Sequence, residues 1–138
     1  MRLLMWHVDG FTAEPTTRGR SPVADDEPQT VTIGEGLVVF VAAEAVDEED
    51  TTGVEQRAVA AIMQTARQLG TQTVALHSFA HLFVERLATP AVARELLVGM
   101  EARLKEQGLT VSQSAFGWFN RLDLRAKGHA YSRMARRV

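Results

Sequence analysis

The sequence predicts a single α/β domain in which helices pack against a mixed β-sheet. The chain has 138 residues, enough for one domain with its own core. Residues 36–43 form a continuous apolar run rich in β-branched side chains, which is typical of a central strand. A helical pattern and a second apolar run at 71–77 follow, and this strand–helix–strand order predicts a right-handed parallel crossover.

The first 35 residues divide into a strand and a long connection. Residues 2–8 are apolar at successive positions, as in an interior strand covered on both sides. We expect Asp9-Gly10 to end this strand. Residues 11–35 contain three prolines and the acidic run Asp25-Asp26-Glu27. Connections of this length in compact domains are either functional or mobile. A mobile excursion and a lid both fit residues 11–35, and the absence of a chemical constellation favours the excursion.

Two helices are marked by their ends. Thr52 and Glu55 have capping-box spacing, an apolar stripe follows, and Gly70 provides a C-terminal cap. Thr89-Pro90 predicts an N-cap followed by proline in the first turn, and Gly108 ends the second helix.

The remaining segments predict two further strands and an arginine-rich tail. Residues 109–115 form a fourth apolar run. Residues 118–126 alternate between apolar and charged side chains, which predicts a strand with one solvated face, antiparallel to its neighbour. The tail from 128 to 138 carries three arginines. Together with Arg125 and Lys127 they could contact RNA phosphates, although a solvated tail explains them equally well.

Composition excludes several classes of function. The chain contains no cysteine, so disulfides, thiolate metal sites and a cysteine nucleophile are excluded. No apolar run approaches the roughly 18 residues of a membrane span, and we expect a cytoplasmic protein. The net charge of −2 gives no overall attraction to nucleic acid, so any RNA contact requires a local basic patch.

Motifs of catalysis and metal binding are weak. His77 and His81 are four residues apart, but the stretch between them lacks the glutamate of a zinc protease, and the pair straddles a strand end. We expect no metal and no cofactor. Ser78 and Ser114 could act as nucleophiles only if a base met them in space, and no nucleophile-elbow motif is present.

A stronger indication comes from several short segments taken in order. They are Met1-Arg2-Leu3-Leu4, Glu44-Ala45-Val46-Asp47-Glu48, Phe79-Ala80-His81-Leu82 with Pro90-Ala91-Val92-Ala93, Ala115-Phe116-Gly117 with two aromatic residues, and Lys127-Gly128-His129. Together they resemble the N-terminal editing domain of archaeal threonyl-tRNA synthetases. The likeness spans nearly the whole chain except residues 11–35.

The resemblance implies a D-aminoacyl-tRNA deacylase-like fold, a homodimer, and an aminoacyl-tRNA deacylase as the activity. Members of that family remove serine wrongly attached to threonine tRNA by substrate-assisted attack of a positioned water. A synthetic site rejects a substrate one methyl smaller by only about 10–200-fold, which is why a second site is needed. The expected partners are the aminoacyl 3′ end of tRNA and threonyl-tRNA synthetase. The chain's end at Val138 favours an enzyme acting in trans, although a segment cut from a larger protein fits equally.

The resemblance also predicts the site. It implies His81 and Asn120 as catalytic residues, and the following residues as substrate-binding: Phe79, Ala80, Phe116, Gly117, Phe119 and Lys127. Core packing is the alternative for Phe79, Phe116 and Trp118. The family places a tyrosine and then a lysine where this chain has Phe119 and Asn120, and a glutamate where it has Arg133. An amide orients water but supplies no charge. The competing hypothesis is therefore a weakly active or inactive module that binds tRNA or a synthetase.

Overall fold

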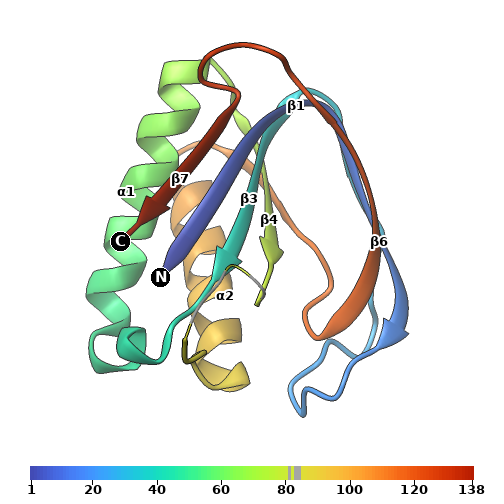
Figure 1. Cartoon of the computed structure of the whole chain (residues 1–138), viewed down its shortest axis with the longest axis vertical. Coiled ribbons are helices and arrows are strands. Elements are labelled where there is room, and N and C mark those ends of the chain that lie inside the picture. The colour runs from blue at the N-terminus through green and yellow to red at the C-terminus, as the bar shows by residue number, and fades with distance from the viewer. Residues whose placement is uncertain (81, 83–84) are drawn as a thin grey trace.

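The computed structural model describes residues 1–80, 82 and 85–138, and its described strands form one curled sheet with two α-helices on one side (Figure 1). The elements are β1 (Arg2–Arg18), β2 (Val31–Ile33), β3 (Gly36–Ala42), the 3₁₀-helix η1 (Ala45–Glu49), α1 (Thr51–Leu69), β4 (Thr73–Ser78), α2 (Pro90–Glu106), β5 (Thr110–Gln113), β6 (Trp118–Ala126) and β7 (Arg133–Arg137). The strand order is β2-β1-β3-β4-β5, and β6 and β7 both pair with β1. The predicted parallel crossover is confirmed, since β3 and β4 are parallel.

The main core lies between the sheet and the two helices. Alternate residues of β1, among them Leu3 and Met5, are fully buried on this face, where they pack with Leu76 of β4. The helices contribute Ile62 and Met100 to the same cluster. The expected interior strands therefore bury both faces, because a second layer covers the other side of the sheet.

That second layer is the outer half of β1 with β6. The pairing of β1 with β6 shifts register between Val8 and Gly10, and β1 bends there (Figure 1). Its outer half carries Phe11 over the sheet, where it joins Phe40 of β3 and Leu124 of β6 in a second apolar cluster. The sheet thus curls over itself and leaves an open end between its two layers.

The prediction that Asp9-Gly10 ends the first strand is wrong. The strand absorbs the irregularity as a bulge and continues to Arg18, so residues 11–18 do not belong to a loop. Residues 31–33 form β2, which leaves 19–30 as the connection. The arginine-rich tail also contains a strand that was not predicted from the sequence. This strand, β7, pairs with the first half of β1.

The helix ends differ in part from prediction. Asp50, rather than Thr52, caps α1 by accepting a hydrogen bond from the Gly53 amide. Gly70 is in the left-handed region with φ +67°, as expected for a C-terminal cap. Thr89 is the N-cap of α2, with proline following. Within the described residues, neither helix is long and apolar enough to cross a membrane.

Candidate active site

A pocket of about 380 Å³ opens where the parallel strands end. Its walls come from the ends of β3 and β4, the start of α2, the turn between β5 and β6, and the beginning of the 19–30 connection. Ligand sites of open α/β sheets lie outside the carboxyl ends of the strands, and this pocket has that position. The remaining wall comes from β6, whose residues 118–120 and 122 line the pocket.

The residues predicted for the site come together only in part. Those lining the pocket are Phe79, Ala80, Phe116, Gly117, Phe119 and Asn120. His81 lies outside the described residues. Lys127 is not among the lining residues.

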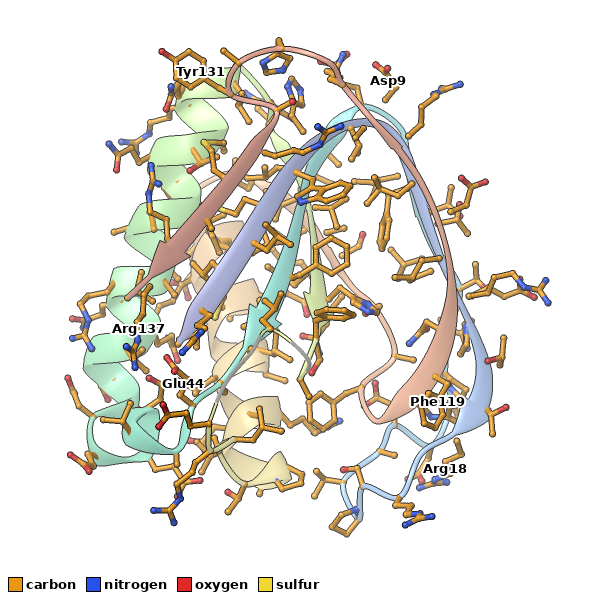
Figure 2. The ribbon with its side chains drawn as sticks, viewed as in Figure 1. Asp9, Arg18, Glu44, Phe119, Tyr131 and Arg137 are labelled. Atoms are coloured by element: carbon orange, nitrogen blue, oxygen red, sulfur yellow. The ribbon has the colours of Figure 1, made fainter. Side chains whose placement is uncertain are left out.

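Lys127 lies at the opposite end of β6. Its Nζ is 2.8 Å from Asp9 Oδ1 and 3.6 Å from a carboxylate oxygen of Glu35. The hydrogen bond to Asp9 raises the pKa of the Lys127 ammonium. Figure 2 shows Asp9 and Phe119 at opposite ends of the β1–β6 layer. At about 3.3 Å per strand residue, Lys127 and Phe119 are roughly 25 Å apart.

Asn120 presents an unpaired oxygen at the pocket. Its amide nitrogen donates to the Trp118 carbonyl at 2.9 Å, whereas its buried Oδ1 accepts no hydrogen bond from the described residues. A buried acceptor left without a partner costs about 1–3 kcal/mol. Leu124 packs into the second cluster and Leu122 lines the pocket, so alternate β6 side chains point inward, and Asn120 continues that row. Asn120 Oδ1 is therefore an acceptor beside the pocket whose hydrogen-bonding capacity the described residues leave unused.

His77 contributes a second polar group. It lies at the end of β4, lines the pocket, and is only 6% exposed. Its Nδ1 is 2.6 Å from Ser114 Oγ. Burial lowers the pKa of His77 to about 4, so the imidazole is neutral at physiological pH. Ser114 is itself buried and is not among the residues that line the pocket, which argues against a nucleophilic role for it.

Asp25 joins the 19–30 connection to the pocket wall. Its carboxylate accepts hydrogen bonds from the Phe116 amide at 2.8 Å and from Arg94 of α2 at 2.9 Å. The Trp118 indole donates to the Asp25 carbonyl at 2.8 Å, and the Gly19 amide donates to the Gly117 carbonyl at 2.8 Å. In the sequence, Asp25 is only one member of an acidic run. An acidic residue between prolines was the one available signal, and it does not identify a partner ninety residues away.

Phe119 differs from the other aromatic residues of the pocket. It is 65% exposed at the rim, whereas Phe116 is buried in the main core. An exposed aromatic ring beside a pocket offers a stacking surface for a nucleobase. Core packing, the alternative considered from the sequence for Phe79, Phe116 and Trp118, describes Phe116, which is buried in the main core.

A second, more polar pocket is lined by Glu44, which Figure 2 labels. Its buried Glu44 carboxylate is already paired with Arg2 at 3.1 Å and with Arg137 at 3.1 Å. Across the part of the chain that the structure describes, no group of three or more potential ligands could hold a metal ion. The first pocket is therefore the stronger candidate, because it combines apolar walls with a polar atom, Asn120 Oδ1, that has no partner among the described residues.

Comparison with known proteins finds a family that covers the whole chain. The family model of the archaea-specific editing domain of threonyl-tRNA synthetase matches residues 1–138. The chain belongs to this editing-domain family. Among curated relatives, the threonine–tRNA ligases of Methanopyrus kandleri and Methanoculleus marisnigri are each 37% identical to it. Both matches cover the whole editing domain but only 22% of the ligase, so the chain spans about a fifth of these relatives.

Solved structures establish the fold of this editing domain. A c-Myc DNA unwinding element binding protein superposes with a TM-score of 0.70 at 13% identity, covering all of this chain and 99% of that one. A probable eukaryotic D-amino acid tRNA deacylase superposes with a TM-score of 0.62 at 11% identity, covering 92% and 94%. The predicted D-aminoacyl-tRNA deacylase-like fold is confirmed.

Proposed function

We propose that this editing domain hydrolyses the ester of a mischarged tRNA, with seryl-tRNA(Thr) as its substrate, and that it acts on tRNA supplied in trans. Membership of the family and the deacylase-like fold support tRNA deacylation and editing as the general activity. The observation that carries the proposal is the unpaired Asn120 oxygen in a pocket otherwise lined mainly by apolar groups. Such a pocket holds a small amino acid and one ordered water.

In the proposed reaction, the Asn120 oxygen accepts a hydrogen bond from a water and orients it toward the ester carbon. The water oxygen bonds to this carbon, and the bond to the ribose oxygen breaks. One water proton passes to the ribose oxygen, and the amino acid leaves as its carboxylate after losing the second. The neighbouring ribose hydroxyl of the tRNA assists, as the family resemblance implies. Asn120 positions the water but neither accepts nor donates a proton in the reaction, because an amide does not titrate in the useful range.

The exposed Phe119 ring at the rim supports recognition of the terminal adenosine by stacking, which contributes about 1–3 kcal/mol per base. Homodimerisation and binding to threonyl-tRNA synthetase follow from the resemblance alone. Light scattering at working concentration tests the first, and a species of only 15.2 kDa would contradict it.

The test is single-turnover hydrolysis of seryl- and threonyl-tRNA(Thr) by the purified chain. We expect selective loss of serine, and we expect Asn120→Ala to slow it by about tenfold or more through loss of water positioning. Asn120→Asp, which keeps an acceptor oxygen, should retain more activity than Asn120→Ala. If the wild-type chain releases serine no faster than the spontaneous rate, the deacylase proposal fails. Filter binding of tRNA would then test the alternative of an inactive binding module.

A further inference from the structure

The proposed reaction gives no role to the imidazole of His77, which lines the pocket. His77 is the only imidazole among the described lining residues, and the proposed hydrolysis needs no proton from it. It extends from β4 into the layer covered by β6, while Asn120 approaches the same pocket from β6 itself. The two side chains therefore belong to opposite walls of one pocket.

The surroundings of His77 are aromatic. The ring centroids of Phe40, Phe79 and Phe11 lie 5.5, 6.2 and 6.4 Å from that of His77. Such apolar neighbours give a low local dielectric, where one hydrogen bond to a neutral group is strong and an unmatched polar group is costly. An apolar box with a single hydrogen-bonding nitrogen matches a small neutral polar group and disfavours a fully apolar one.

Ser114 fixes the orientation of this nitrogen. Its Oγ lies 2.6 Å from Nδ1, and its backbone amide donates to the Leu76 carbonyl at 3.0 Å, so the serine is anchored beside the end of β4. With Nδ1 occupied, Nε2 is the ring atom left to interact with a ligand. Among the described residues only Nδ1 of this ring has a hydrogen-bond contact, and Nε2 is not one of the fully enclosed atoms that lack a partner, so Nε2 remains accessible from the pocket. Burial also keeps the ring neutral at physiological pH.

We propose that His77, oriented by Ser114, binds the side-chain hydroxyl of the aminoacyl group through Nε2 and makes the pocket selective for a hydroxyl-bearing amino acid. This inference rests on the proposed deacylase function. A site built to hydrogen-bond a hydroxyl discriminates strongly against an analogue that lacks it, because the nitrogen that the bound ligand covers is then left unpaired.

The test compares seryl-tRNA(Thr) with alanyl-tRNA(Thr), which differ only by that hydroxyl. We expect the wild-type kcat/KM to be at least tenfold higher for seryl-tRNA. His77→Asn keeps a polar atom where Nδ1 meets Ser114 but has none at the position of Nε2. It should therefore lower the seryl rate about tenfold and leave the alanyl rate within twofold. His77→Gln, which retains a polar atom near the Nε2 position, should recover part of the seryl rate. A purely structural role predicts the reverse order of these two variants and equal losses on both substrates, which would overturn the inference.

The serine that positions the ring provides a matched pair of variants. Ser114→Ala should reduce the preference for seryl-tRNA by about threefold or more, whereas Ser112→Ala, two residues earlier on β5 and not among the pocket residues, should leave it unchanged. Equal effects of the two serine variants would contradict the positioning role.

A binding experiment separates this inference from the deacylase proposal. Non-hydrolysable amide analogues of seryl- and alanyl-adenosine would be added to the ¹⁵N-labelled chain while the His77 Nε2 resonance is followed. A shift with the seryl analogue alone supports the role of His77 even if the chain releases no amino acid from tRNA. If the chain is active but Nε2 responds identically to both analogues, the deacylase proposal stands and hydroxyl recognition by His77 is refuted.

Discussion

Asp25 and Phe116, ninety-one residues apart in sequence, are joined by two hydrogen bonds. The Asp25 carboxylate accepts from the Phe116 amide at 2.8 Å, and the Asp25 amide donates to the Phe116 carbonyl at 3.0 Å. The connection expected to be a loose excursion is thereby fixed to the turn that forms the pocket wall. The same carboxylate also reaches Arg94 at 2.9 Å, so one side chain links three parts of the site.

Replacing Asp25 should weaken both the fold and the site. Asp25→Ala removes charge-assisted hydrogen bonds to Phe116 and Arg94, and we expect a loss of about 1–3 kcal/mol in the free energy of unfolding, measured by urea titration. The matched control is Asp26→Ala, because the Asp26 side chain is 90% exposed and should change stability by less than about 0.5 kcal/mol. Similar losses in both variants would show that the Asp25 contacts are not specific.

Gly117 combines a left-handed backbone with a close approach. Its φ is +75°, and a Cβ at this position would lie 2.6 Å from the Ala24 Cβ. Gly117→Ala should therefore cost about 2–4 kcal/mol, the sum of left-handed strain and overpacking, and should also slow deacylation. Gly70→Ala separates the two contributions, since Gly70 has φ +67° with open space around it and should cost only about 1–2 kcal/mol. Equal costs in thermal or urea unfolding would exclude the steric contribution.

His77 makes the stability depend on pH in a defined direction. Its pKa in the folded chain is about 4, below the ordinary value of 6.5, so the unfolded state takes up a proton first as the pH falls. The free energy of unfolding should therefore decrease from pH 6.5 toward pH 4, by up to about 3 kcal/mol from this residue alone. His77→Asn should flatten the dependence over this window in urea titrations. Some slope should persist, because burial also lowers the pKa of His7. Parallel curves for wild type and variant would contradict the assignment.

Lys127 tests the position of the site. Because it is paired with Asp9 at the far end of β6, it cannot touch an amino acid held beside Asn120. Lys127→Met should leave the single-turnover rate at saturating chain within about twofold. If Lys127 contacts tRNA phosphates, losing that contact in Lys127→Met would instead raise the KM and reduce the salt dependence of the KM. A tenfold fall in the saturated rate would show that Lys127 reaches the substrate, as the family resemblance predicts. Arg125→Met, a neighbouring basic residue on the same strand, is the control for loss of charge.

Local patterns in the sequence were sufficient for most elements and for much of the pocket. The apolar run at 36–42 and the helix ended by Gly70 depend on interactions between near neighbours, which a sequence displays directly. The ordered motifs around Phe79 and Phe116 likewise identified two segments that meet in the pocket. Both are strand ends, and parallel strands bring their ends to the same edge of a sheet.

The tertiary structure alone decided which distant groups meet. The course of β1 through Asp9-Gly10 depends on a bulge stabilised by pairing with β6, more than a hundred residues later. The His77–Ser114 contact and the anchoring by Asp25 likewise join side chains whose neighbours in sequence give no sign of a partner. Lys127, adjacent to the pocket motif in the linear order, is carried to the other end of the molecule by a single extended strand. Strand length and pairing, rather than proximity in sequence, therefore determine which polar groups face the substrate.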